Sequence, residues 1–178
     1  MGERIIGARR AFAGRLISVR VDEVEMPNGR RSTREVVEHP GAVAILPWDG
    51  ERLALVRQWR LPAGRELLEI PAGTLEASEE PMATAVRELA EECGLAAASW
   101  VEGPRFFTAP GFCTELMHLY LATDLTASGG AGADPDEEIA GIEWLTLRDA
   151  VAAIDDGRIE DAKSMAAIGW LARRLSIG

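Results

Sequence analysis

Three glutamates near the end of one expected helix constrain this chain more than any other feature of its sequence. Glu88 lies three residues before Glu91 and four residues before Glu92. On an α-helix, with about 100° per residue, the three carboxylates share an arc of roughly 100°. Like charges at this spacing cost an isolated helix about 0.2–0.5 kcal/mol per pair. The pattern therefore indicates either a solvated acidic face or a site for a hard cation, because Mg²⁺ binds through oxygen ligands.

The flanking residues define this helix. Ser78 is expected to cap its N-terminus, Pro81 suits its first turn, and Gly94 suits the left-handed position just beyond its end. Apolar residues recur at helical spacing on a separate arc: Met82, Ala85, Val86, Leu89 and Cys93. Residues 73–78 are therefore predicted to form a loop that leads into an amphipathic helix, with the glutamates in its last two turns.

Size and charge limit the classes of function. With 178 residues, of which 47% are hydrophobic, the chain can bury one core and a small appended subdomain. Its net charge of −10 repels nucleic acid, so no nucleic-acid partner is expected. The same negative charge repels a diphosphate anion. An enzyme of this charge that acts on diphosphates would therefore recruit them through divalent cations and local arginines. Arg57, Arg60 and Arg65 form such a basic group upstream of the helix.

Other features favour a cytoplasmic protein without a membrane partner. No apolar run approaches the length of a membrane span, and the first ten residues lack the apolar centre of a secretion signal. The two cysteines, Cys93 and Cys113, do not have the spacing of metal ligands. Both are therefore expected to be reduced thiols in the core.

Strand patterns dominate the first hundred residues. Residues 16–25 alternate apolar and polar side chains, the turn Pro27-Asn28-Gly29 follows, and residues 34–38 return as a second strand. Further strands are expected at residues 41–47, 53–58, 100–107, 117–123 and 142–145, and helices at residues 147–156 and 159–175. A helix among strands and two closing helices indicate an α/β fold with a mixed sheet covered on both faces. Residues 1–39 are expected to form a separate N-terminal β segment, and residues 40–178 the main domain.

The stretch from Gly73 to Leu95 resembles the signature box of the Nudix hydrolases. It matches the box without a departure at seven positions: Gly73, Glu79, Arg87, Glu88, Glu91, Glu92 and Gly94. The resemblance implies the Nudix α/β/α sandwich with a mixed sheet, to which this chain adds a small N-terminal antiparallel β segment. It also implies hydrolysis of a nucleoside diphosphate linked to another moiety. This match favours the cation site over the solvated acidic face.

The resemblance also implies roles for residues of the box. Glu88 and Glu92 would carry the metal ions, helped by Glu91 and by the backbone carbonyl of Ala72. The expected cofactor is Mg²⁺, with Mn²⁺ as a substitute. Arg87 is expected to pair with Glu79 and so to orient the helix rather than to contact the substrate.

Residues outside the box resemble the ADP-ribose pyrophosphatase branch of the family. Its features here are Leu68-Glu69-Ile70-Pro71-Ala72-Gly73 before the box, Ala109-Pro110-Gly111-Phe112 after it, Arg57 and Arg60 upstream, Glu115, and Asp161-Ala162-Lys163 near the C-terminus. The branch implies that Arg60 binds the diphosphate and that Glu115 lies in the substrate site, alongside Arg57, Pro110 and Gly111. A surface arginine and a solvated loop acid are the alternatives for Arg60 and Glu115. Ala109 stands where the branch often has serine, so Thr108 would have to supply the hydroxyl contact.

The general base is expected on the glycine-rich loop before the last strand. In some relatives a glutamate of this loop performs the role, and in others the box glutamates suffice. Glu137 matches best by its distance to Ile139, and Asp136 and Glu138 are its neighbours. A soluble acidic loop tip is the alternative interpretation.

The sequence as a whole predicts a Mg²⁺-dependent hydrolase that cleaves ADP-ribose to AMP and ribose 5-phosphate. A pyrophosphatase for another nucleoside diphosphate sugar, such as GDP-mannose, is the alternative. A non-catalytic module that binds ADP-ribose is a minor one, because such modules usually have eroded boxes. The N-terminal strands add an apolar edge, and relatives in this branch exchange such segments, so a homodimer is expected.

Overall fold

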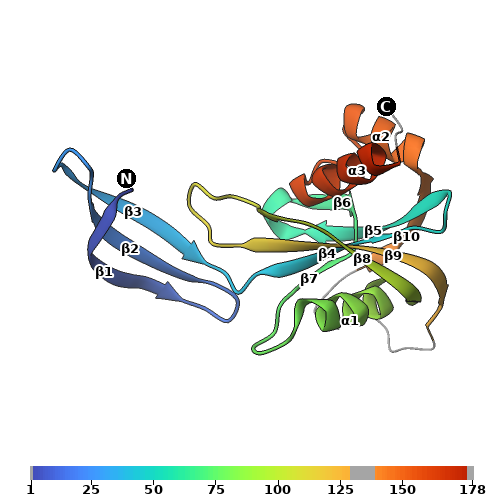
Figure 1. The fold of residues 1–178 in the computed structure, drawn as a ribbon, viewed down its shortest axis with the longest axis horizontal. Coiled ribbons are helices and arrows are strands. Elements are labelled where there is room, and N and C mark those ends of the chain that lie inside the picture. Colours follow the sequence, from blue (N-terminus) through green and yellow to red (C-terminus); the bar gives the residue numbers. More distant parts are fainter. Residues whose placement is uncertain (1, 129–138, 176–178) are drawn as a thin grey trace. The chain divides into compact units, whose positions relative to one another are not determined.

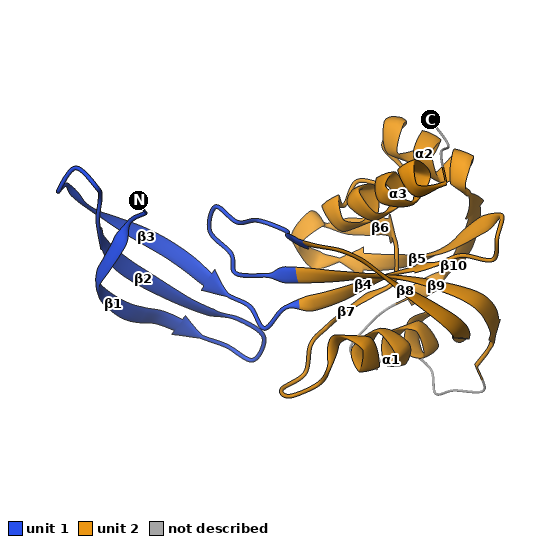
Figure 2. Ribbon diagram, viewed as in Figure 1, with its two compact units in different colours: residues 1–41, 106–116 blue, residues 42–105, 117–178 orange. Residues whose placement is uncertain are grey.

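The computed structural model of the chain describes residues 2–128 and 139–175. These residues divide into two units, coloured separately in Figure 2. The first contains residues 1–41 and 106–116, and the second contains residues 42–105 and 117–178. The acidic helix and the arginines upstream of it belong to the second unit, whereas Pro110, Gly111 and Glu115 belong to the first.

The first unit is built on a three-stranded antiparallel sheet. Its strands are β1 (Arg4–Ala13), β2 (Ser18–Glu25) and β3 (Arg31–Glu38), in the order β1-β2-β3. The predicted hairpin is present, and Gly29 takes a φ of 79° at its turn. The first strand was not predicted, because its side chains are mostly exposed and follow no apolar alternation. Residues 106–116 join β3 where the Val37 N–H donates to the Phe112 carbonyl at 2.7 Å.

The second unit contains two sheets. The strands β10 (Ile139–Thr146), β5 (Arg52–Arg60) and β6 (Arg65–Glu69) form one sheet. The strands β7 (Ala72–Thr74), β4 (Ala42–Pro47), β9 (Leu116–Ala127) and β8 (Leu95–Phe107) form the other, in that order. Because β4 pairs parallel with β9 and antiparallel with β7, the second sheet is mixed, as predicted. The short strands β6 and β7 were not predicted.

Helices cover both faces of these sheets (Figure 1). Helix α1 (Pro81–Cys93) packs on β4, β5 and β7. On the opposite side, α2 (Leu147–Asp155) packs on β5 and β10, and α3 (Ala162–Arg174) packs on β4. A 3₁₀ turn (Leu61–Ala63) links β5 to β6. The predicted α/β/α sandwich is therefore confirmed. No helix of the described ranges is long and apolar enough to cross a membrane.

Helix α1 differs from the prediction at its start. Glu80, not Ser78, is its N-cap, and Ser78 has a φ of 68° in the preceding turn. The residue before a proline is driven out of the helical region by a steric clash, so Pro81 sets the start. Gly94 ends the helix with a φ of 60°, as predicted. Val86 was predicted in the apolar stripe but is 49% exposed, because it lies at the edge of that arc.

The C-terminal elements agree with the predicted order but not with every boundary. Helix α3 begins three residues later than predicted, because Asp161 caps it by accepting the Ser164 N–H, although Ile159 is buried as expected for a core residue. Strand β10 is longer at both ends than predicted. Glu137 and its acidic neighbours lie outside the described residues, as does the glycine-rich loop beyond Ser128.

Candidate active site

Two of the three carboxylates at the end of α1 are buried rather than solvated. Glu88 is 7% exposed, Glu92 is 5% exposed, and Glu91 is half-buried. A helix face that serves solubility would leave these side chains in water, where a carboxylate is most stable. Burying two like charges one turn apart is unfavourable unless something compensates for them. The solvated acidic face is therefore excluded, and the groups that face the glutamates must supply the compensation.

The backbone of β7 lies directly against two of these carboxylates. The Ala72 N–H donates to Glu92 Oε2 at 3.0 Å. A Cβ atom at Gly73 would lie 1.8 Å from Glu88 Oε1, so the position is open to the Glu88 carboxylate only because glycine has no side chain. Pairing of β7 with β4, with Gly73 opposite Val43, holds this backbone in place. The glycine of the box is thus explained by a close approach.

Arg87 supplies much of the compensating charge. Its guanidinium lies 2.8 Å from Glu88 Oε1 and 2.8 Å from Glu91 Oε2. It also donates to Glu79 at 3.3 Å, so the predicted pair is confirmed. Burial alone would lower the pKa of Arg87, but its hydrogen bonds to Glu79 and Glu91 and the charge of Glu88 raise it above the ordinary value. Arg87 therefore stays charged.

The donor set suits a hard divalent cation. The three carboxylates of α1 and the backbone of β7 offer oxygen atoms and no soft ligands. Within residues 2–128 and 139–175, however, no three or more Asp, Glu, His or Cys side chains already converge on one point. Glu88 and Glu91 point to Arg87 instead. A cation bound here would therefore compete with Arg87 for these two side chains.

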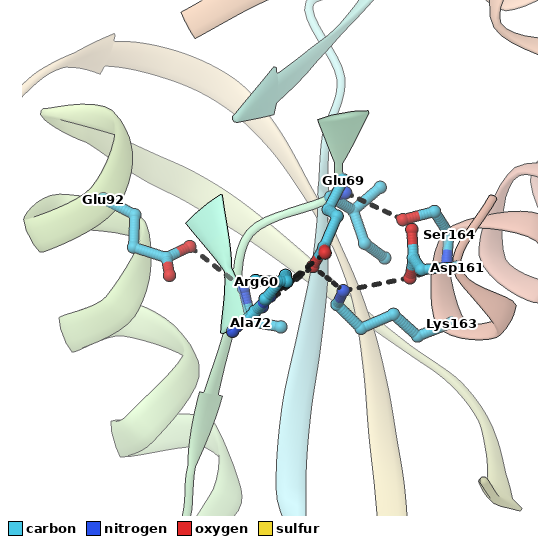
Figure 3. A network of polar contacts seen from close by, with 8 residues as sticks. Arg60, Glu69, Ala72, Glu92, Asp161, Lys163 and Ser164 are labelled. Atoms are coloured by element: carbon cyan, nitrogen blue, oxygen red, sulfur yellow. Dashed lines mark hydrogen bonds and ion pairs between the residues drawn. The ribbon is translucent and has the colours of Figure 1, made fainter. Parts of the chain in front are cut away.

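The upstream arginines are ion-paired. Arg57 donates to Glu143 of β10 at 2.6 Å, and Arg65 donates to Glu160 at 2.8 Å. Arg60 forms a bidentate ion pair with Glu69, in which Nε donates to Oε1 at 3.0 Å and Nη2 donates to Oε2 at 2.8 Å (Figure 3). The predicted basic group is thus charge-balanced by acids of three different segments.

Glu69 is the centre of a polar network for which the sequence predicted no role (Figure 3). It is 2% exposed and also accepts from Lys163 of α3. Burial would raise its pKa, but the hydrogen bond from Arg60 and the charge of Lys163 lower it below the usual range. Lys163 donates in turn to Asp161 Oδ1 at 2.9 Å. Glu69, Arg60 and Lys163 all lie in segments that resemble the branch, but no sequence pattern links Glu69 to a lysine 94 residues away.

The predicted substrate residues of the first unit form a local cluster. Thr108 donates its hydroxyl to Glu115, whose other oxygen lies 3.7 Å from His39 Nε2. Pro110 and Gly111 lie in a turn that is closed by the Cys113 N–H donating to the Ala109 carbonyl at 2.9 Å. The Thr108 hydroxyl, expected to serve the substrate, is therefore engaged by Glu115. Substrate binding by these residues stays a prediction.

The cysteines differ in burial. Cys93, the last residue of α1, packs in the core, and burial with the nearby Glu92 charge raises the pKa of its thiol to about 12. Cys113 is only half-buried, in the first unit. Both are free thiols, as predicted, but only Cys93 is a core residue.

Comparison with known proteins covers nearly the whole chain. Residues 38–168 match the NUDIX domain, and residues 3–37 match the nucleoside diphosphate sugar hydrolase N-terminal domain. The chain is 40% identical to an ADP-ribose pyrophosphatase of Bacillus subtilis (strain 168), over 95% of this chain and 92% of that protein. It is 43% identical to a methanol dehydrogenase activator of Bacillus methanolicus, again over 95% and 92%.

The chain is more distantly similar to an enzyme named for another substrate and to a solved structure. A GDP-mannose pyrophosphatase of Citrobacter koseri is 32% identical, over 79% of this chain and 78% of that protein. The crystal structure of an ADP compounds hydrolase superposes with a TM-score of 0.87, covering 99% of this chain and 95% of that chain at 23% identity. At this identity the structural match supports the fold.

Proposed function

Since this chain belongs to the Nudix hydrolase family, we propose that it hydrolyses the pyrophosphate bond of ADP-ribose and releases AMP and ribose 5-phosphate. The observation that carries the proposal is the pair of buried glutamates, Glu88 and Glu92, held against the backbone of β7. Identity to an ADP-ribose pyrophosphatase is 40%, against 32% for the GDP-mannose enzyme, which favours ADP-ribose as substrate.

Nudix hydrolases act with divalent metal ions, and we assign Mg²⁺ to this site, with Mn²⁺ as a substitute. Glu88, Glu91, Glu92 and the Ala72 carbonyl would hold the metal, since all four offer oxygen donors from α1 and β7. When bound, such an ion lowers the pKa of water and neutralises phosphate charge. Arg87 would hold the Glu88 and Glu91 side chains in place until a cation binds, through its ion pairs with both.

In the reaction, a water oxygen forms a bond to one phosphorus, the bond from that phosphorus to the bridging oxygen breaks, and the water proton passes to a base. Glu137 is the proposed base, with the box glutamates as the alternative. Arg57 and Arg60 are proposed to bind the diphosphate, because a chain with a net charge of −10 needs local cations to attract it. Pro110, Gly111 and Glu115 are proposed to contact the rest of the substrate.

Residues 1–39 are proposed as a dimerisation element, and residues 40–178 as the catalytic domain. The first unit exposes several large apolar side chains, namely Ile5, Phe12, Leu16, Phe107 and Phe112. Exposed apolar groups of this size are common where a second subunit binds. A C2 homodimer is the commonest way for one chain to cover them. A cytoplasmic location is proposed with it.

A panel of nucleoside diphosphate compounds tests the substrate. ADP-ribose, GDP-mannose and UDP-glucose would each be incubated with the protein and Mg²⁺, and the released nucleoside monophosphate would be quantified. The proposal expects kcat/KM for ADP-ribose to exceed that for GDP-mannose. Faster release of GMP would establish the alternative substrate, and binding of ADP-ribose without any release would establish the non-catalytic module.

A further inference from the structure

The five residues from Glu69 to Gly73 connect two groups of charged side chains. At one end, Glu69 is bound by Arg60 of β5 and by Lys163 of α3. At the other end, the Ala72 N–H donates to Glu92, and Gly73 lies against the Glu88 carboxylate. Figure 3 shows the two ends side by side, with the Ala72–Glu92 contact on one side and the Glu69 network on the other. Whatever fixes Glu69 therefore fixes the backbone that holds the metal-binding glutamates.

The N-terminal turn of α3 also forms a hydrogen bond with the segment from Glu69 to Gly73. The Ile70 N–H donates to Ser164 Oγ at 2.9 Å, and both residues are buried. Asp161 Oδ1 accepts from the Ser164 N–H at 3.0 Å and from Lys163 Nζ at 2.9 Å. One carboxylate thus caps the helix and orients the lysine that reaches Glu69. The first turn of α3 therefore has two adjoining residues, Lys163 and Ser164, that contact the segment, which is more than capping a helix requires.

The ion pairs of Glu69 are expected to be hard to break, so they hold its position firmly. Glu69 is 2% exposed, and a buried carboxylate that loses one cationic partner leaves the remaining charges unbalanced. Hydrogen bonds between ionised groups are about twice as strong as neutral ones. Only Ile70 and Pro71 separate Glu69 from Ala72, so a displacement of Glu69 is transmitted to the Ala72 backbone almost directly. A metal site tolerates small errors only, because ligand positions must match the ion within tenths of an ångström.

We infer that Glu69, Lys163 and Ser164 are positioning residues for the metal site, and that α3 sets the affinity of α1 for its cation through the segment between them. The inference rests on the proposed function, since it takes Glu88 and Glu92 as the metal-binding pair. None of the three is among the residues proposed to hold the cation or to bind the substrate. Changing the groups that support metal ligands commonly weakens metal affinity by about 10–100-fold.

Binding of Mn²⁺ in the absence of substrate tests this inference, because free Mn²⁺ can be quantified by its electron paramagnetic resonance signal. Lys163→Met, Glu69→Gln and Ser164→Ala would be compared with the wild-type protein, and Glu66→Gln is the matched control on the same strand. Glu66 is exposed, so its loss leaves the network intact. The expected result is a Kd for Mn²⁺ about 10-fold weaker in Lys163→Met and Glu69→Gln, a smaller weakening in Ser164→Ala, and no change in the control.

Thermal unfolding measured on the same samples separates positioning from stability. Variants that melt earlier but bind Mn²⁺ with the wild-type Kd would overturn the inference, as would an equal loss in Glu66→Gln. If Glu69→Gln fails to fold, Ser164→Ala decides, because it removes one hydroxyl and no charge. A wild-type protein that binds Mn²⁺ but leaves ADP-ribose intact would overturn the proposed substrate and leave this inference standing.

Discussion

Replacing Gly73 with alanine would place a methyl group where the Glu88 carboxylate now lies. The added Cβ would be 1.8 Å from Oε1, 2.0 Å from Cδ and 2.5 Å from Cγ of Glu88. Real Cβ contacts essentially never fall below 3.0 Å, so the carboxylate must move by about 1 Å or more. Gly73 does not have a positive φ, so alanine is compatible with its backbone conformation. The substitution is therefore expected to displace the Glu88 carboxylate rather than to strain the backbone.

The expected effect on activity is much larger than the effect on stability. A misplacement of about 1 Å in a catalytic arrangement can cost roughly 10²-fold in rate. An extra methyl group in a packed site costs about 1–3 kcal/mol of unfolding free energy, which a folded domain usually survives. Gly73→Ala should thus fold, melt somewhat earlier, and lose about 10²-fold in kcat/KM for ADP-ribose with Mg²⁺.

Steady-state kinetics and thermal unfolding would measure the rate and stability of Gly73→Ala beside those of a control variant. Gly169→Ala is the control, because the nearest atom to its new methyl group would be Arg173 Nη1 at an ordinary 3.7 Å. Gly169 lies within α3, so alanine there should stabilise the protein by about 0.4–1 kcal/mol and leave the rate unchanged. A Gly73→Ala protein that keeps more than about a tenth of the wild-type rate would show that the position of Glu88 is not what the glycine protects.

Four further predictions concern the site and the assembly. Glu92→Gln should retain the fold and lose about 10²–10⁴-fold in rate, and a rate above about a tenth of wild type would contradict its metal role. Glu137→Gln should lower kcat with little change in KM. A wild-type kcat here with a loss in Asp136→Asn or Glu138→Gln would make that neighbour the base, and a wild-type kcat in all three would leave the box glutamates. Light scattering should give a homodimer at micromolar concentration, so a mass near 19.2 kDa would reject it. Because burial raises the pKa of Cys93 to about 12, iodoacetamide at pH 8 should modify Cys113 and spare Cys93, and peptide mass spectrometry showing the reverse would contradict that burial.

Much of the fold could be predicted because the strands and helices are specified locally. The alternation in β2, the apolar run in β4 and the proline and glycine that bound α1 all act within a few residues. Predictions were wrong where a nearby residue or a paired strand overrides the conformational preference of a residue. Ser78 is a good capping residue, but Pro81 excludes the helical conformation from the residue before it. Strand β1 exists because β2 pairs with it, and its own residues do not predict that pairing.

The chemistry of the candidate site was likewise present in the sequence, because helical spacing alone brings Glu88, Glu91 and Glu92 together. Burial of Glu88 and Glu92, by contrast, depends on where β7 lies. The arginines illustrate the same limit, since Arg60 was predicted as a substrate ligand and is also the partner of a buried glutamate.

The sequence by itself determined the order of the elements, the acidic helix and the oxygen-rich donor set, because these follow from interactions among near neighbours in the chain. Only the tertiary structure decided that Gly73 must lack a side chain and that Lys163, 94 residues beyond Glu69, completes the network on the far side of the same segment. The physical reason is that such contacts join residues distant in the chain. Their existence depends on the sheet that brings α1, β7 and α3 together, and no local pattern encodes that proximity.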